Sequence, residues 1–186
     1  SRCAAIPARA CAPGSASVRP SKFSGGLGQG CFVSTQYLRH HSLPDSTPDP
    51  DGVHEVIGHA NQLASPRFAS LYRKVGDAVK RVHTDQAVQF LSRVFWFTIE
   101  FGAVREHGEL KAYGAGILSS FGELDAFRGA DVRPFDVAAM GAQAYDITRY
   151  QPILFAADST TALVDEMSDF LDHFDDDSYE RYMRAA

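Results

Sequence analysis

The residues whose types and spacing could do chemistry are two histidines in the segment HEVIGH and one glutamate further along the chain. His54 and His59 stand five positions apart. Zinc metalloproteases of the H-E-x-x-H type place two histidines four positions apart, about 40° from each other around a helix. Five positions on an ideal α-helix separate the imidazoles by about 140°. Both rings can therefore reach one ion only if the helix widens into a π-type turn near residues 57–59, or begins at His54.

The glutamate is Glu100, which lies in the apolar segment VFWFTIEFG. An ionised carboxylate left unpaired in such surroundings costs several kcal/mol, so it needs a cation. Arg93 or Arg105 is the ordinary solution, and two neighbouring histidines are often no more than packing residues. The more specific hypothesis is that this cation is a metal ion bound by His54 and His59. Two imidazoles and one carboxylate form the facial arrangement that leaves positions open on Fe(II), as oxygenases require.

The elements that must position these residues follow from periodicity and capping signals. Pro48 and Pro50 predict extended backbone just before a helix that begins near Asp51. Apolar periodicity predicts three more helices: one from Ser65-Pro66 to about Arg81, one capped by Thr84 or Asp85 with apolar positions up to Ile99, and a final long one capped by Asp158 or Ser159. Short strands are expected at 31–38, 109–114 and 153–157, and a turn into a short helix at 114–124. We therefore expect a mainly α fold, or α+β with a few short strands.

Composition excludes several classes of function. The chain has 186 residues and a formal net charge of −5, and it shows no basic stripe, which argues against a nucleic-acid partner. No apolar run approaches the roughly 18–20 residues that a membrane span needs. The three cysteines all lie within the first 31 residues and form no C-x-x-C pair, which favours a reducing, cytoplasmic setting.

The composition also changes along the chain. Residues 1–22 are rich in Ala, Ser, Pro and Arg and contain no acid. We expect this segment to be disordered or an artefact of a gene boundary, with a transit peptide as the alternative. Residues 23–186 read as one globular domain, which we interpret as the C-terminal part of an iron-binding catalytic domain.

Three segments resemble the pterin-dependent aromatic amino acid hydroxylases, the family of the phenylalanine, tyrosine and tryptophan hydroxylases. They are STQYLRHHSLPDSTPDPDGVHEVIGH, FWFTIEFG and ELKAYGAGILSSFGEL, and the likeness runs in order from about Phe23 to the end of the chain. The catalytic cores of that family extend further upstream, so the resemblance implies a catalytic domain that is incomplete at its N-terminus. The proline that commonly follows the second histidine in the mammalian enzymes is absent, so the chain looks like a bacterial, phenylalanine hydroxylase-like member.

The resemblance implies a role for each matching residue. His54, His59 and Glu100 correspond to the iron ligands, and Arg39 corresponds to the residue that pairs with the carboxylate of the substrate, which suits the two-point grip of a guanidinium. The remaining matches concern the substrate and the pterin: Thr47 and Ser119 help to seat the amino acid backbone, Trp96 and Phe101 contribute to the aromatic pocket, Phe23 stacks on the pterin, and Glu55 approaches it.

The implied activity is a monooxygenation. Fe(II), a tetrahydrobiopterin or related tetrahydropterin, and O2 would hydroxylate the ring of an aromatic amino acid, with phenylalanine to tyrosine as the expected reaction. The alternatives are tryptophan, tyrosine or another ring position within the family, and a catalytically silent truncated relic that at most binds metal. A zinc hydrolase ranks third. The oligomeric state does not follow from the sequence.

Overall fold

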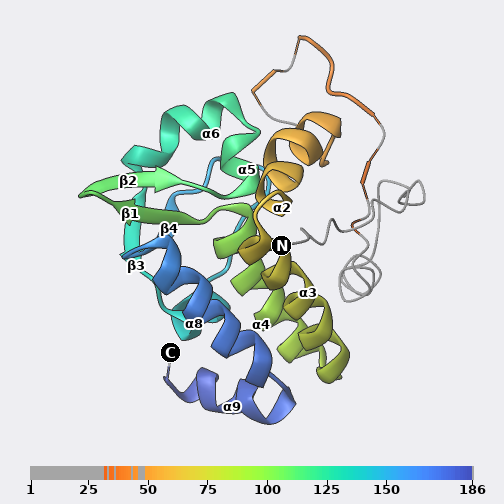
Figure 1. Ribbon diagram of the computed structural model, residues 1–186, viewed down its shortest axis with the longest axis vertical. Coiled ribbons are helices and arrows are strands. Elements are labelled where there is room, and N and C mark those ends of the chain that lie inside the picture. Colours follow the sequence, from red (N-terminus) through yellow and green to blue (C-terminus); the bar gives the residue numbers. More distant parts are fainter. Residues whose placement is uncertain (1–31, 33, 36, 43, 46–48, 186) are drawn as a thin grey trace, which may run out of the picture.

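Helices make up most of the part of the chain that the structure describes, and a small sheet lies among them (Figure 1). The computed structural model describes residues 32, 34–35, 37–42, 44–45 and 49–185. The helical segments are η1 (His54–Ala60), α2 (Asn61–Leu63), α3 (Pro66–Arg81), α4 (Asp85–Phe95), η2 (Trp96–Glu100), α5 (Ala115–Leu118), α6 (Phe121–Ala126), η3 (Phe127–Gly129), α7 (Val137–Ala142), α8 (Thr160–His173) and α9 (Asp176–Ala185). The strands are β1 (Ala103–Glu106), β2 (Glu109–Ala112), β3 (Asp131–Pro134) and β4 (Ile153–Ala157). The predicted fold class, mainly α with a few short strands, is confirmed.

The sheet is mixed, with the strand order β2-β1-β4-β3. Strands β1 and β2 form an antiparallel hairpin, whereas β4 runs parallel to both β1 and β3. The two residues of the hairpin turn, His107 and Gly108, have φ angles of 53° and 79°. Positive φ at both positions matches the right-handed twist of the flanking strands, and glycine adopts it without strain.

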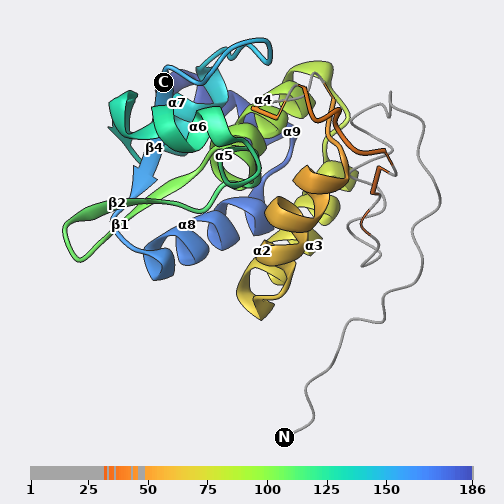
Figure 2. The same ribbon diagram turned by 90° about the horizontal axis from the view of Figure 1, so that it is seen from above.

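The helices bury a large hydrophobic cluster. In α4, Phe90, Leu91 and Val94 are buried, and Phe170 and Leu171 of α8 belong to the same cluster. Helix α3 packs against α8, and Figure 1 shows α5 and α6 at the opposite end of the molecule from α9. Figure 2, the view from above, shows α8 beside β1. The predicted caps are confirmed at two helices, because Thr84 accepts from the backbone N–H of Ala87 and Ser159 from that of Ala162.

One predicted strand is wrong. The described residues of the segment 31–38 form no strand. Their polar backbone groups instead bind the region around η1: Tyr37 O accepts from Gly52 N at 2.7 Å, and Thr35 N donates to Glu55 Oε1 at 3.4 Å. Tertiary contacts with that region therefore override the β-favouring composition of this segment.

Five elements were not predicted: β1, β3, η3, α7 and α9. Strands β1 and β3 have four residues each, and α7 has six, so their periodicity gives a weak signal. The helix α8 is not the last one, because α9 follows it after a short junction at residues 174–175.

In the part of the chain that the structure describes, no helix has the length and apolar character to cross a membrane.

Candidate metal centre

The two histidines lie at the ends of a π-helical segment. Residues His54–Ala60 form η1, which confirms the predicted widening. A π-turn bonds residue i to i+5, so residues five apart return to the same face of the helix. At the N-terminal end, Asp51 Oδ1 accepts from the backbone N–H of His54 at 3.0 Å. The wide turn thus solves the spacing problem of H-E-x-x-G-H without breaking the helix.

Glu100 ends a second π-helical segment, η2, which continues directly from α4. The backbone N–H of Phe101 closes this segment by donating to Trp96 O at 2.8 Å. The loop after β2 then passes very close to it. A Cβ atom on Gly114 would lie 2.4 Å from Glu100 O, so only glycine allows this approach. The end of η2 is therefore held between the loop and the core.

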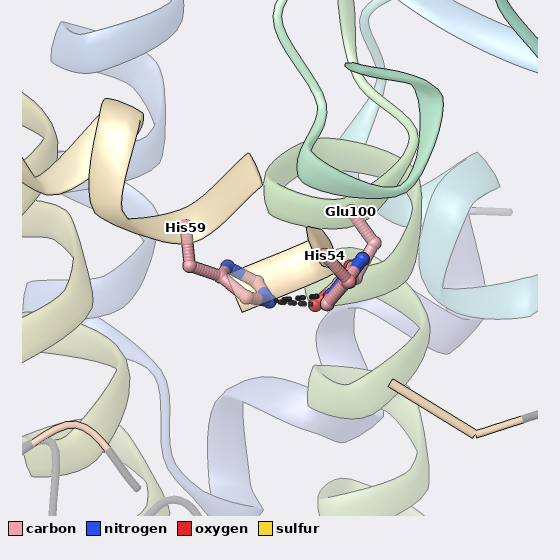
Figure 3. A group of neighbouring side chains, drawn as sticks. All are labelled: His54, His59 and Glu100. Atoms are coloured by element: carbon pink, nitrogen blue, oxygen red, sulfur yellow. Dashed lines mark hydrogen bonds and ion pairs between the residues drawn. The ribbon is translucent and has the colours of Figure 1, made fainter. Parts of the chain in front are cut away.

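The three side chains converge, as predicted (Figure 3). The Nε2 atoms of His54 and His59 lie 2.9 Å apart. Glu100 places one oxygen 3.2 Å from His59 Nε2 and the other 3.5 Å from His54 Nε2. Arg93 is not the partner of Glu100, because it donates to Gly141 O at 3.2 Å, and Arg105 is exposed.

These separations fit one metal ion. Ligands at about 2.1 Å in adjacent positions of an octahedron lie about 3.0 Å from each other. The two nitrogens lie 2.9 Å apart, and they lie 3.2 and 3.5 Å from different oxygens of the Glu100 carboxylate. Two nitrogen donors and one oxygen donor on one face leave the opposite face open, which suits a non-haem Fe(II) site.

The charges around the three groups also favour a cation. Burial lowers the pKa of His54. Burial acts in the same direction on His59, but the Glu100 carboxylate outweighs it and raises the pKa of that imidazole. The pKa of Glu100 is lowered, because both histidines outweigh the effect of its burial. The site therefore favours a positive charge between the three groups, which a proton or a metal ion can supply.

Arg39 is held by a partner that the sequence analysis did not single out. Its Nε and one terminal nitrogen donate to the two oxygens of Asp51, at 3.0 and 2.8 Å, and its other terminal nitrogen donates to Pro44 O at 3.1 Å. The Asp51 side chain is fully buried, and although burial alone raises its pKa, the hydrogen bonds from Arg39 and from two backbone N–H groups lower it to about 2. Two of the five N–H donors of the guanidinium form no hydrogen bond with the described residues.

Arg39 and Ser119 line the same cavity, whose volume is about 400 Å³. Val53, Leu118 and Phe121 contribute apolar walls to it. The Ser119 hydroxyl also lies 2.8 Å from His54 Nδ1, so this cavity adjoins the metal centre. The structure thus brings together two residues that the resemblance assigns to substrate binding.

The two predicted aromatic residues lie together but in different surroundings. The rings of Trp96 and Phe101 are 4.5 Å apart. Phe101 is buried in a small cluster with Ile117 and Leu154, whereas Trp96 is half-buried and stacks on Tyr145 at 4.1 Å. Their role in a substrate pocket stays a prediction.

Of the two residues matched to pterin binding, one is described. Glu55 is buried and accepts from the backbone and hydroxyl of Thr35 through Oε1, at 3.4 Å each. Its Oε2 atom has no hydrogen-bond partner among the described residues. Phe23, the other one, and Thr47 lie outside the described residues.

Sequence reasoning missed the residues behind the histidines. The hydroxyl of Tyr72 lies 2.6 Å from His59 Nδ1, and the side chain of Gln62 contacts that hydroxyl in turn. No local pattern links positions 59, 62 and 72. Asp51, by contrast, stands three residues before His54, where the preference for a capping carboxylate would have indicated it.

The sequence is similar to those of known proteins. Residues 9–184 match the family model of the biopterin-dependent aromatic amino acid hydroxylases, a match that begins before Phe23. A phenylalanine 3-hydroxylase from Streptomyces coeruleorubidus is 55% identical over 157 residues, which cover 84% of this chain and 56% of that protein. The chain thus spans little more than half the length of this relative.

Solved structures agree in fold. The phenylalanine hydroxylase of Legionella pneumophila superposes with a TM-score of 0.83 at 28% identity, over 94% of this chain and 74% of that one. The enzyme of Chromobacterium violaceum, crystallised with iron(III) and 7,8-dihydrobiopterin, gives a TM-score of 0.76 at 28% identity, over 83% and 58% of the two chains.

Proposed function

Because the chain belongs to the biopterin-dependent aromatic amino acid hydroxylase family, we propose that it hydroxylates the ring of phenylalanine with Fe(II), a reduced pterin and O2. The observation that carries the proposal is the convergence of His54, His59 and Glu100, whose donor atoms lie close enough together to bind one ion. These three residues would hold the iron. When bound with the reduced pterin, the iron would supply the activation of O2 that ring hydroxylation requires.

The protein would contribute binding and orientation. The two free donors of Arg39 can grip the carboxylate of the amino acid, while Asp51 fixes the plane of the guanidinium. Thr47 and Ser119 would seat the backbone of the amino acid, and Trp96 and Phe101 would flank its ring. On the pterin side, the buried Glu55 Oε2 can accept from an N–H group, and Phe23 would stack on the ring system.

The ring position is the finer question. The resemblance on its own favours tyrosine as the product, that is, attack at position 4. The relative from Streptomyces coeruleorubidus is named as a phenylalanine 3-hydroxylase and shares 55% identity with this chain. We therefore place the hydroxylation at position 3, with position 4 as the second candidate.

A product assay tests this function. The protein is incubated with Fe(II), tetrahydrobiopterin and O2, and phenylalanine, tyrosine and tryptophan are offered in turn. We expect 3-hydroxyphenylalanine from phenylalanine; because it has the mass of tyrosine, chromatographic standards must separate the two. The His59→Ala variant serves as the control and should form no product. Tyrosine as the product would move the attack to position 4, and an iron-loaded protein without any product would favour the silent relic.

A further inference from the structure

Two buried side chains, Tyr72 of α3 and Gln62 of α2, form a hydrogen-bonded chain behind His59. The Tyr72 hydroxyl oxygen lies 2.6 Å from His59 Nδ1 and also contacts Gln62 Oε1. Tyr72 is 2% exposed and Gln62 is 6% exposed. Because both side chains are buried, their hydrogen-bond donors and acceptors have to be matched within the protein.

The orientation of the Gln62 amide determines which groups donate and which accept in these hydrogen bonds. The amide nitrogen of Gln62 reaches two backbone carbonyl oxygens, Ile99 O at 2.9 Å and Tyr113 O at 2.8 Å. A carbonyl oxygen accepts but cannot donate, so the NH2 group must occupy this position and Oε1 must face Tyr72. Tyr72 consequently donates its proton to Gln62 Oε1 and can offer His59 only a lone pair.

His59 must then donate from Nδ1. A neutral imidazole carries a single N–H, so Nε2 is left with its lone pair. That lone pair is directed to the space shared by His54 Nε2, 2.9 Å away, and Glu100, 3.2 Å away. This tautomer is the one that a metal ligand bound through Nε2 needs.

We propose that Tyr72 and Gln62 are positioning residues that hold His59 in the Nδ1–H tautomer with Nε2 turned toward the metal. This inference rests on the proposed function, since it takes His59 to be an iron ligand. Gln62 does more than determine which nitrogen of His59 carries the proton. Its amide binds the carbonyl that precedes Glu100 in η2 and the carbonyl of Tyr113 before α5, so it also links the position of His59 to that of Glu100.

Two variants separate this role from plain packing. Tyr72→Phe removes the hydroxyl and keeps the ring. Gln62→Leu keeps the hydroxyl but frees it to turn round and donate to His59 Nδ1, which shifts the imidazole proton to Nε2. We expect each variant to weaken Co(II) and Fe(II) binding 10- to 100-fold in anaerobic competition with a chelator. The double variant should lose little more than the weaker-binding single one, because the two residues act in series.

A matched control and a spectroscopic signature complete the test. Tyr182→Phe removes a hydroxyl from another core-packed tyrosine, on α9, and should leave metal affinity unchanged. In ¹⁵N NMR spectra of the metal-free protein, recorded at a pH high enough to leave His59 neutral, His59 should carry its proton on Nδ1 in the wild type and on Nε2 in Gln62→Leu. If the wild type binds metal and forms product while both variants bind equally tightly, the inference fails and the proposed function stands. A wild type that binds no metal overturns both.

Discussion

At the scale of single residues, the neighbours of a buried acid decide whether it can serve as a ligand. Glu100 is buried beside two imidazoles, and its pKa is lowered, so it remains a carboxylate. Glu123 is 5% exposed, and the one hydrogen bond to its carboxylate among the described residues comes from the backbone N–H of Gln151 at 3.1 Å. Burial raises the pKa of Glu123 to about 7, although that hydrogen bond acts to lower it. Burial among different neighbours therefore lowers the pKa of one glutamate and raises that of the other.

The raised pKa of Glu123 predicts a dependence of stability on pH. An acid whose pKa is higher in the folded state stabilises the fold below its unfolded pKa, here 4.5, and that stability is lost as the pH rises through about 7. Glu123→Gln stays neutral at every pH. We expect this variant to be about 3 kcal/mol more stable than the wild type at pH 8.5, with the difference shrinking toward zero below pH 4.5.

Urea unfolding at both pH values measures this difference. Glu166→Gln, which removes a charge from an exposed position of α8, is the matched control and should change stability by less than about 0.5 kcal/mol at either pH. An equal effect of Glu123→Gln at both pH values would show that Glu123 does not titrate with the fold.

At the scale of elements, the metal centre depends on the close approach of η1 to α5. A Cβ atom on Gly58 would lie 2.8 Å from both the Cβ and the carbonyl oxygen of Ala115. Because backbone atoms are involved, neither helix can yield locally. Ser119, which binds His54 Nδ1, follows directly on α5. Any separation of the two helices therefore disturbs a ligand.

Gly58→Ala should consequently affect both stability and metal binding. We expect a loss of about 1–3 kcal/mol in the free energy of unfolding, typical of overpacking, together with weaker binding of Fe(II). Gly129→Ala is the control, since a Cβ atom there meets no other atom within 4 Å, and it should change neither quantity noticeably. The measurements are urea unfolding and a metal titration; unaltered metal affinity in Gly58→Ala would argue against the coupling of α5 to the site.

The same elements show what the sequence could and could not predict. The spacing of His54 and His59 predicts a π-type turn, because helix geometry is local and an ordinary α-helix cannot bring both rings together. Tyr72 and Gln62 were missed, because their contacts depend on how α3 packs behind η1, which no short pattern records. The strand expected at 31–38 was wrong for a related reason. Its residues favour β structure, but long-range hydrogen bonds to Gly52 and Glu55 decide its conformation.

At the scale of the whole molecule, metal binding and folding are linked. The three proposed ligands come from two π-helical segments that lie forty-odd residues apart in the sequence, so an unfolded chain cannot present them together. A metal that binds only the folded chain stabilises it by about 2.7 kcal/mol when the free metal is present at 100 times its dissociation constant. The proposed metal site would therefore also join η1 to η2 and stabilise the fold.

The most direct test of the account is an anaerobic titration of the purified protein with Fe(II). We predict that one Fe(II) binds per chain and that His54→Ala, His59→Ala and Glu100→Ala each abolish this binding. The exposed His83 provides the control, and His83→Ala should bind one Fe(II) with unchanged affinity. Binding that survives in all three ligand variants, or a wild-type chain that binds no Fe(II), would contradict the account.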